Sequence, residues 1–267
     1  MTVLIASSKR DVAAQNIARA LIQLKGFRPA SGVPDLFQIG NVYLKLVETD
    51  GIYTDSLGVD SRPEAVIFAS RHRSESSEPA LTVHWTGNST GRADFGGKPK
   101  SLSFADPPRL RAALLALDKA REVLKLDYAV TLEATHHGPT ELGVPTLFVE
   151  VGSTEKEWND PRAAVAASGA IWEAATAPVG GTAAVGFGGG HYCNKQCLAV
   201  RNDNFAFSHI FSKYFFEDYD ERMVRLAFER TIGECRSAVV DWKGIRGAER
   251  SKLIETLKRL HVDVVRV

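Results

Sequence analysis

The feature that most constrains how this chain folds is its alternation of short apolar runs with longer amphipathic segments. The runs at 2–7, 64–70 and 146–153 are short and rich in β-branched or aromatic residues, which is typical of buried strands. The segment 106–125 has leucine and alanine at intervals of three and four, and it opens on Asp-Pro, a common helix start. This alternation predicts an α/β fold with a largely parallel sheet that helices cover on both faces.

The length of 267 residues suits one large α/β domain or two small ones. Polar or glycine-rich stretches occur near 86–100 and 186–197, but strand-like runs continue on both sides of each. We therefore expect a single domain over residues 1–267. Residues 86–100 form a long polar loop that we expect to be flexible, and a loop of this length in a compact domain is usually functional or mobile.

Composition narrows the class of protein and of partner. The net charge of +1 excludes a polycation, so binding of nucleic acid needs a local basic patch. The three cysteines are too few for a disulfide scaffold, and their odd number fits a reducing compartment. No apolar run approaches 18 residues and the first residues lack a signal-peptide pattern, so we expect a cytoplasmic protein with no membrane partner.

The placement of histidine is the strongest chemical signal in the sequence. Five of the seven histidines follow four predicted strands, in the segments 71–76, 84–88, 136–140 and 188–192. Ligands bind open α/β sheets beyond the carboxyl ends of the strands, so we expect these imidazoles to share one site. Neighbouring side chains of an extended strand point to opposite faces, so His136 and His137 reach one pocket together only if their strand has already ended.

Two chemistries fit this pattern, and spacing alone does not choose between them. Catalytic zinc commonly takes three protein ligands and a water molecule. Without a metal, a histidine or a glutamate would act as general base towards water. The candidates are His84, His136 and His191 as nitrogen ligands, and Glu133, Glu141 and Glu150 as carboxylates.

Other residues near the predicted strand ends are candidates for substrate binding. The glycine run 188–190 permits close approach of the backbone to a phosphate or a ribose, although it is equally typical of a flexible turn. Positive side chains beside a catalytic pocket would suit a polyanion. These cations are Arg71, Arg73, Lys98 and Lys100.

Three sequence blocks together resemble a known family. The blocks are SRHRSESSEPALTVHWTGN (70–88), LEATHHGPTELGVPTLFVEVGSTEKEWND (132–160) and GFGGGHYCNKQ (186–196). They are similar to the signature blocks of the archaeal and plant-type D-aminoacyl-tRNA deacylases. The resemblance implies hydrolysis of the ester between a D-amino acid and the 3′ end of tRNA, with dependence on zinc (Zn2+). It also implies a three-layer α/β/α fold with a mixed, largely parallel sheet, similar to peptidyl-tRNA hydrolases and nucleoside phosphorylases.

The resemblance also directs attention to individual residues, whose roles we assign as a hypothesis. Zinc is expected on His84, His136 and His191. The expected catalytic residues are Glu133, His137, Thr140 and Glu141. The expected substrate-binding residues are Arg71, His72, Arg73, Ser74, Asn88, Lys98, Lys100, Gly189 and Gly190.

The expected partner is D-aminoacyl-tRNA, and the sequence indicates no obligate protein partner, so we expect a monomer. Two alternatives are a zinc-dependent amidase or peptidase on the same scaffold and a non-catalytic tRNA-binding module. The histidines argue against the binding module, because binding of RNA alone needs arginine, lysine and aromatic side chains more than histidine.

Overall fold

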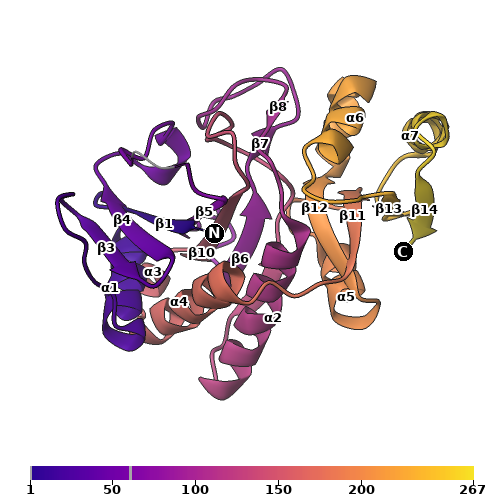
Figure 1. Ribbon diagram of the computed structural model, residues 1–267. Coiled ribbons are helices and arrows are strands. Elements are labelled where there is room, and N and C mark those ends of the chain that lie inside the picture. The colour runs from indigo at the N-terminus through magenta and orange to yellow at the C-terminus, as the bar shows by residue number, and fades with distance from the viewer. Residues whose placement is uncertain (1, 60–61) are drawn as a thin grey trace.

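The computed structural model describes residues 2–59 and 62–267, and Figure 1 shows its two main sheets side by side. The larger sheet has eight strands in the order β2-β3-β4-β1-β5-β10-β6-β9. Its strands are β1 (Val3–Ser8), β2 (Arg28–Pro29), β3 (Leu36–Ile39), β4 (Val42–Val47), β5 (Ala65–Arg71), β6 (Ala80–Trp85), β9 (Ala129–Leu132) and β10 (Thr146–Gly152).

The direction of the strands in this sheet decides where the site can form. Strands β4, β1, β5 and β10 are parallel, whereas β6 runs antiparallel to β10 and β9 runs parallel to β6. The carboxyl ends of β6 and β9 therefore lie at one side of the sheet, next to the amino ends of β5 and β10, and the carboxyl ends of β5 and β10 lie at the opposite side. The expectation that all the histidine-bearing strand ends meet at one edge is wrong for this reason. The site instead forms on one face of the sheet, where His84 of β6 lies opposite Phe148 of β10.

Alternation along the strands separates the two faces of the sheet. On one face, Ile5, Ile67 and Val149 join the main hydrophobic core with the helices α1 (Val12–Lys25), α2 (Pro107–Val123) and α4 (Pro161–Thr176). On the other face, Phe68 and Phe148 stack at a ring separation of 4.6 Å within a smaller cluster. The histidine site lies on this second face, away from the long helices.

The second sheet has four parallel strands, in the order β12-β11-β13-β14. One face of this sheet joins the main hydrophobic core together with α5 (Asn194–Asn202). The other face packs on α6 (Glu221–Glu229) and α7 (Gly247–Arg259), which lie to the right in Figure 1. These strands are β11 (Thr182–Phe187), β12 (Phe205–Phe211), β13 (Ser237–Val240) and β14 (Asp263–Arg266).

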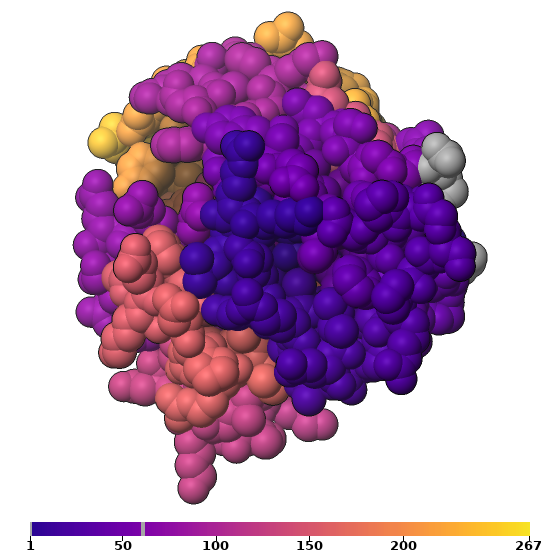
Figure 2. All heavy atoms as spheres, turned by 90° about the vertical axis from the view of Figure 1, so that its left-hand side faces the viewer, coloured from indigo at the N-terminus to yellow at the C-terminus, as the bar shows by residue number. Residues whose placement is uncertain are grey.

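Shorter elements complete the description. The strands β7 (Gly87–Asn88) and β8 (Ser101–Leu102) pair with each other, so the long polar loop 86–100 is partly closed by a small ladder. The remaining helical turns are η1 (Gly51–Tyr53), α3 (Glu155–Trp158) and η2 (Lys213–Asp218). The surface seen in Figure 2 is formed mainly by the N-terminal part of the chain, drawn in indigo and purple.

Local sequence explains the helix boundaries. Asp11 accepts a hydrogen bond from the backbone N–H of Ala14 and caps the start of α1, and Gly26, with a φ of 78°, caps its end after Lys25. The helices α2 and α4 both carry proline in the first turn, as their Asp-Pro openings predict. The predicted α/β fold with a mixed, largely parallel sheet is confirmed. Within the described residues, no helix is both long and apolar enough to cross a bilayer.

Candidate metal centre and active site

Three histidine side chains converge on one buried carboxylate. Glu133 follows β9, and its Oε2 atom lies 3.5 Å from Nε2 of His191, 3.6 Å from Nε2 of His136 and 3.7 Å from Nε2 of His84. The side chains of Glu133 and His84 are fully buried, whereas His191 is half exposed. The expected convergence of imidazoles from distant parts of the sequence is therefore observed.

Backbone pairing explains why these residues meet. The chain after β9 continues alongside the end of β6, with a bridge between Thr86 and His136. The chain after β11 runs antiparallel to it, with a bridge between Glu133 and Tyr192 and a hydrogen bond from the N–H of Ala134 to the carbonyl of His191. The second sheet thus delivers His191 to a site built on the first.

The contacts around Glu133 have the spacing of metal ligands. Both oxygens of Glu133 and Nε2 of His84 are buried, and none has a hydrogen-bond partner of acceptable geometry among the described residues. Buried polar atoms are normally satisfied, so these three atoms need an explanation. Ligand atoms of a tetrahedral zinc ion with bonds of about 2.0–2.1 Å lie about 3.3–3.4 Å apart, which is close to the observed separations. Two overlapping groups, Glu133–His136–His191 and His84–His136–His137, each bring three potential ligand atoms within 4.8 Å of one another, so the residues present could hold a metal ion such as zinc.

The tautomers of two histidines also suit ligation. Nδ1 of His84 lies 3.2 Å from the carbonyl oxygen of Trp85, and Nδ1 of His136 lies 2.8 Å from the carbonyl oxygen of Ala134. A carbonyl only accepts, so each Nδ1 carries the proton and donates it. The lone pair of each ring is then on Nε2, the atom that faces Glu133. Histidines that ligate metals are commonly held by a second hydrogen bond of this kind.

A second carboxylate lies beside the first. Glu150 of β10 has its Oε2 atom 3.4 Å from Nδ1 of His72 and 3.8 Å from Nε2 of His84, and it accepts a hydrogen bond from the hydroxyl of Thr82. Nδ1 of His72 is also 2.9 Å from Oε1 of Glu133. On its other side, Nε2 of His72 lies 2.7 Å from the hydroxyl oxygen of Tyr192. His72 therefore bridges the two carboxylates.

Charge in the cluster follows from burial and proximity. Burial raises the pKa of Glu133, but the imidazoles of His191 and His72 outweigh burial and hold it well below its usual value. Burial lowers the pKa of His72, but the adjacent carboxylates of Glu133 and Glu150 outweigh burial and raise the pKa to about 11. Burial and the neighbouring histidines lower the pKa of His136 well below its usual range and that of His137 to about 4. Burial lowers the pKa of His84, but the neighbouring Glu150 outweighs burial and raises it. At neutral pH the cluster therefore combines ionised carboxylates and neutral His136 and His137 with a protonated His72. Metal ligation requires neutral imidazoles, so binding of a metal would displace any proton held between His84 and the carboxylates.

The segment 136–138 has left extended backbone, which lets both of its histidines face the same cavity. His137 has a φ of 45°, and the N–H of Gly87 donates to the carbonyls of both His136 and His137. Gly138 lies so close to the loop after β7 that an added Cβ would be 2.3 Å from the backbone nitrogen of Gly97. The predicted end of the strand near the Gly-Pro pair is therefore observed.

The cluster forms the floor of a cavity of about 640 Å³, a volume within the range of small-molecule sites. His136, His137, Glu150 and His191 line it. Its walls come from the chain after β5, from η1 and from Phe95 of the loop between β7 and β8. Of the predicted substrate-binding residues, the cavity lining includes Arg71, His72, Arg73 and Ser74.

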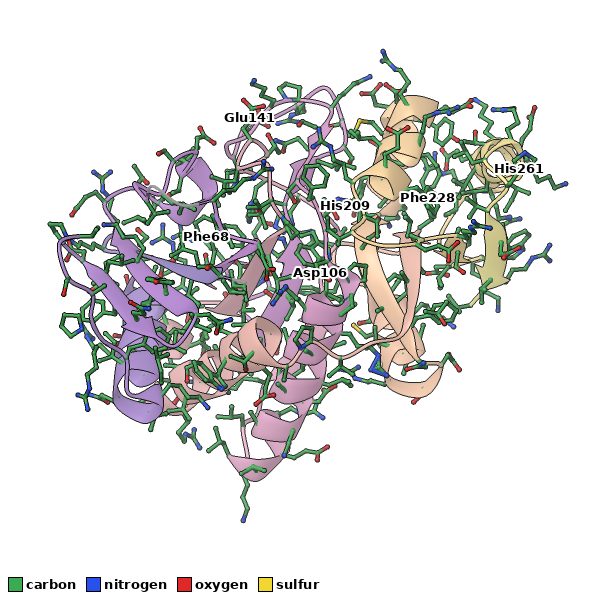
Figure 3. All side chains as sticks on the ribbon, viewed as in Figure 1. Phe68, Asp106, Glu141, His209, Phe228 and His261 are labelled. Carbon is green, nitrogen blue, oxygen red and sulfur yellow. The ribbon has the colours of Figure 1, made fainter. Side chains whose placement is uncertain are left out.

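Other predicted residues take part in contacts outside the cavity. The hydroxyl of Thr140 accepts a hydrogen bond from the N–H of Lys98, and Asn88 donates to the carbonyls of Gly96 and Lys98. Thr140 and Asn88 thus hold the loop that carries Phe95. Glu141 is exposed near the top of Figure 3 and forms an ion pair with Lys98.

Three further predicted residues do not line the cavity. Lys100 is held by Asp220 at 3.2 Å and by Asp218 at 3.7 Å. The carbonyl of Gly189 accepts a hydrogen bond from the N–H of Lys213, and neither Gly189 nor Gly190 lines the cavity. The structure therefore does not place these three residues in the cavity lining.

Several residues of the site carry no clear sequence signal. Asp11 lines the cavity and accepts a hydrogen bond from the N–H of Arg71, but its sequence context indicates only a helix cap. Asp50 lies 3.6 Å from Arg71 and follows no recognisable motif. Phe95 stands in a glycine-rich loop that gives no hint of a role. Tyr192, in contrast, can be identified from the sequence as a candidate site residue, because it directly follows His191.

Comparison with known proteins agrees with this arrangement. A family profile described as D-aminoacyl-tRNA deacylase matches residues 59–265. The chain belongs to the D-aminoacyl-tRNA deacylase family. The protein named D-aminoacyl-tRNA deacylase in Methanosarcina acetivorans is 37% identical to this chain, over 99% of this chain and 92% of the relative. The protein of the same name in Thermococcus onnurineus is 36% identical to this chain, over 98% of both chains.

A solved structure has the same fold as this member of the deacylase family. It is a crystal structure of a conserved protein described as of unknown function, with a TM-score of 0.90 and 32% identity over 99% of this chain and 95% of that one. The arrangement of both sheets is therefore shared with a protein of known structure.

Proposed function

We propose that this protein hydrolyses the ester bond between a D-amino acid and the 3′ end of tRNA, as a D-aminoacyl-tRNA deacylase. Membership of the family supports the reaction and the substrate. The observation that carries the proposal is the convergence of three imidazole nitrogens on Oε2 of Glu133 at the floor of a cavity. A hydrolase needs such a site to activate water, whereas a tRNA-binding module does not.

We further propose that Zn2+ is held by Glu133, His84, His136 and His191. When bound, zinc would act as a Lewis acid that activates water and polarises the ester carbonyl. The support for zinc is chemical: nitrogen and carboxylate ligands, unsatisfied buried atoms and ligand-like spacing.

The protein's own groups would then control the proton and the substrate. Glu150 lines the cavity. Burial raises its pKa, but the adjacent imidazoles of His72 and His84 outweigh burial and lower it, so Glu150 is ionised at neutral pH. We assign to this carboxylate the proton lost by the attacking water. The carboxylates predicted for this role from the sequence are Glu133 and Glu141. Glu133 is assigned here to the metal instead, and Glu141 is committed to Lys98 outside the cavity. His72 lies beside Glu150 and is itself held by the hydroxyl of Tyr192.

The alternative of a zinc amidase or peptidase uses the same cluster, so the choice rests on the substrate. The family match favours the ester of aminoacyl-tRNA. The deciding experiment compares hydrolysis of D-tyrosyl-tRNA and L-tyrosyl-tRNA, with and without a chelator. We expect cleavage of the D-form, little cleavage of the L-form and loss of activity with the chelator. Cleavage of a small peptide without any response to D-tyrosyl-tRNA would contradict the proposal.

A pair of histidine variants tests the cluster itself. We expect His136→Ala to lower turnover at least about 100-fold, because a ligand is lost. His261→Ala is the matched control, because His261 is exposed, does not line the cavity and lies at the right of Figure 3 among the C-terminal elements. Equal activity of the two variants would remove His136 from the site.

We also propose that residues 1–267 fold as one domain and that the protein acts in the cytoplasm as a monomer. One hydrophobic cluster contains residues of both sheets, which supports a single folding unit. Light scattering of the purified protein measures the mass directly, and a mass of twice 29.1 kDa would contradict the monomer.

A further inference from the structure

The mouth of the cavity carries two side chains that have no function inside the protein. We propose that Phe95 stacks on the terminal adenine of the tRNA, and that Arg73 contacts a phosphate of the same single-stranded 3′ end. This inference rests on the proposed deacylase function and adds how the nucleotide end of the substrate is held.

The backbone around Phe95 is held firmly. The carbonyl of Phe95 accepts a hydrogen bond from the N–H of Gly138 at 3.0 Å, and the carbonyl of Gly96 accepts one from Asn88 at 2.8 Å. Gly96 has a φ of 80°, and a Cβ added there would be 2.0 Å from the carbonyl oxygen of Ile52. The loop is therefore fixed against η1 and against the segment that carries the histidines.

The ring of Phe95, in contrast, has no partner. It is 64% exposed and makes no ring contact with another aromatic side chain among the described residues. It nevertheless lines the same cavity as His136 and His137. An apolar ring on a rigid backbone at the mouth of a catalytic cavity is preorganised to bind a flat, apolar surface.

Arg73 is the uncommitted cation of this cavity. It is exposed, it lines the cavity, and no ion pair or hydrogen bond of its side chain occurs within residues 2–59 and 62–267. Arg71, by comparison, lies 3.6 Å from Asp50 and over the ring of Trp158. Lys98 is paired with Glu141. A phosphate would therefore find Arg73 available without breaking an existing ion pair.

The geometry of the substrate assigns the two contacts. The ester must reach the histidines at the floor, and the nucleotide attached to it then lies towards the mouth. Every tRNA presents the same terminal adenosine, whereas the amino acid varies, so a fixed aromatic ring is suited to the constant part. Single-stranded nucleic acids are commonly bound by aromatic stacking on bases together with cations on phosphates.

The first experiment measures steady-state hydrolysis of D-tyrosyl-tRNA and D-alanyl-tRNA. We expect Phe95→Ala to raise KM roughly 5- to 150-fold, the loss that one base–aromatic stack gives, with kcat nearly unchanged. The loss should be the same for both amino acids, and Phe95→Trp should stay within about 3-fold of the wild type. Tyr214→Ala, at an exposed aromatic outside the cavity, is the control and should change nothing.

Other outcomes would overturn the assignment of Phe95. An unchanged KM for Phe95→Ala would exclude stacking. A loss several times larger for D-tyrosyl-tRNA than for D-alanyl-tRNA would place the ring against the amino acid. A Phe95→Trp variant as defective as Phe95→Ala would remove the aromatic plane as the cause. A wild-type protein that cleaves neither substrate would instead refute the proposed function itself.

The second experiment measures the dependence of log(1/KM) on log salt concentration. Arg73→Ala should make the slope less steep by about 0.7, the effect of losing one phosphate contact on a single strand. Lys119→Ala, at an exposed lysine of α2 outside the cavity, is the matched control and should leave the slope unchanged. Phe95→Ala should also leave it unchanged, because stacking involves no charge. Equal slopes for Arg73→Ala and the wild type would overturn the phosphate contact.

Discussion

His209 is the residue through which pH should act most clearly on stability. It lies in β12 at the junction of the two sheets (Figure 3), fully buried. Its Nε2 is 3.1 Å from the carbonyl oxygen of Ser103, and its Nδ1 is 3.2 Å from the hydroxyl of Thr135, the neighbour of His136. A ring with one donated and one accepted bond is neutral. Burial lowers its pKa from 6.5 to about 3, although the hydrogen bond to Ser103 partly opposes this.

The size of the effect follows from the difference between the folded and unfolded states. Below pH 6.5 the unfolded chain binds a proton at this position and the folded protein does not, so the free energy of unfolding falls as the pH is lowered towards 3. At about 1.4 kcal/mol per pKa unit, lowering the pH from 7 to 4.5 removes about 2–3 kcal/mol through this group. Above pH 7 the group contributes no further change.

The variant His209→Gln keeps an amide donor and acceptor but does not titrate. We expect it to be somewhat less stable than the wild type at pH 7 and to lose about 2–3 kcal/mol less between pH 7 and 4.5. Urea unfolding, followed by tryptophan fluorescence at both pH values, measures this difference, because all other titrating groups are common to the two proteins. If the two proteins lose the same free energy on acidification, His209 is not held neutral by burial.

Two further substitutions test the framework of the site. Gly138→Ala should lower the free energy of unfolding by roughly 1–3 kcal/mol and impair turnover, because the added Cβ would lie 2.3 Å from the backbone nitrogen of Gly97. Thermal melting compares this variant with Gly190→Ala, whose Cβ would meet nothing within 4 Å. Equal melting temperatures of the two variants would contradict the close approach. Tyr192→Phe removes the 2.7 Å hydrogen bond to His72. We expect kcat to fall several-fold with KM unchanged, because Tyr192 positions the cluster and does not touch substrate. An altered KM with unchanged kcat, measured in the same deacylation assay, would place Tyr192 against the substrate instead.

Local features of the fold could be predicted from the sequence. The Asp-Pro openings of α2 and α4 and the glycine that ends α1 are short-range signals, and each acts through the backbone of its own segment. The turn at Gly40 joins β3 and β4 as an antiparallel pair for the same reason. No element was predicted between 193 and 219, where the structure has α5 and β12. The apolar positions of α5 are few, and β12 was not separable from its surroundings by alternation.

The site divides in the same way. The grouping of His84, His136 and His191 was predictable, because imidazoles at strand ends are uncommon without a role. The direction of β6 was not, since antiparallel pairing with β10 depends on contacts between residues 62 to 72 positions apart. The ion-pair partners of Lys100 and Glu141 likewise depend on the tertiary fold. The sequence does not reveal these ion pairs, and for this reason both residues were predicted near the substrate although they lie outside the cavity.

Location of the metal tests the central claim most directly. We predict that a crystal of the zinc-loaded protein, measured at the zinc absorption edge, will give an anomalous peak that lies between Oε2 of Glu133 and the Nε2 atoms of His84, His136 and His191. We also predict that Glu133→Gln will weaken both this peak and the hydrolysis of D-tyrosyl-tRNA. A protein that hydrolyses D-tyrosyl-tRNA at full rate without any metal at this position would contradict the account.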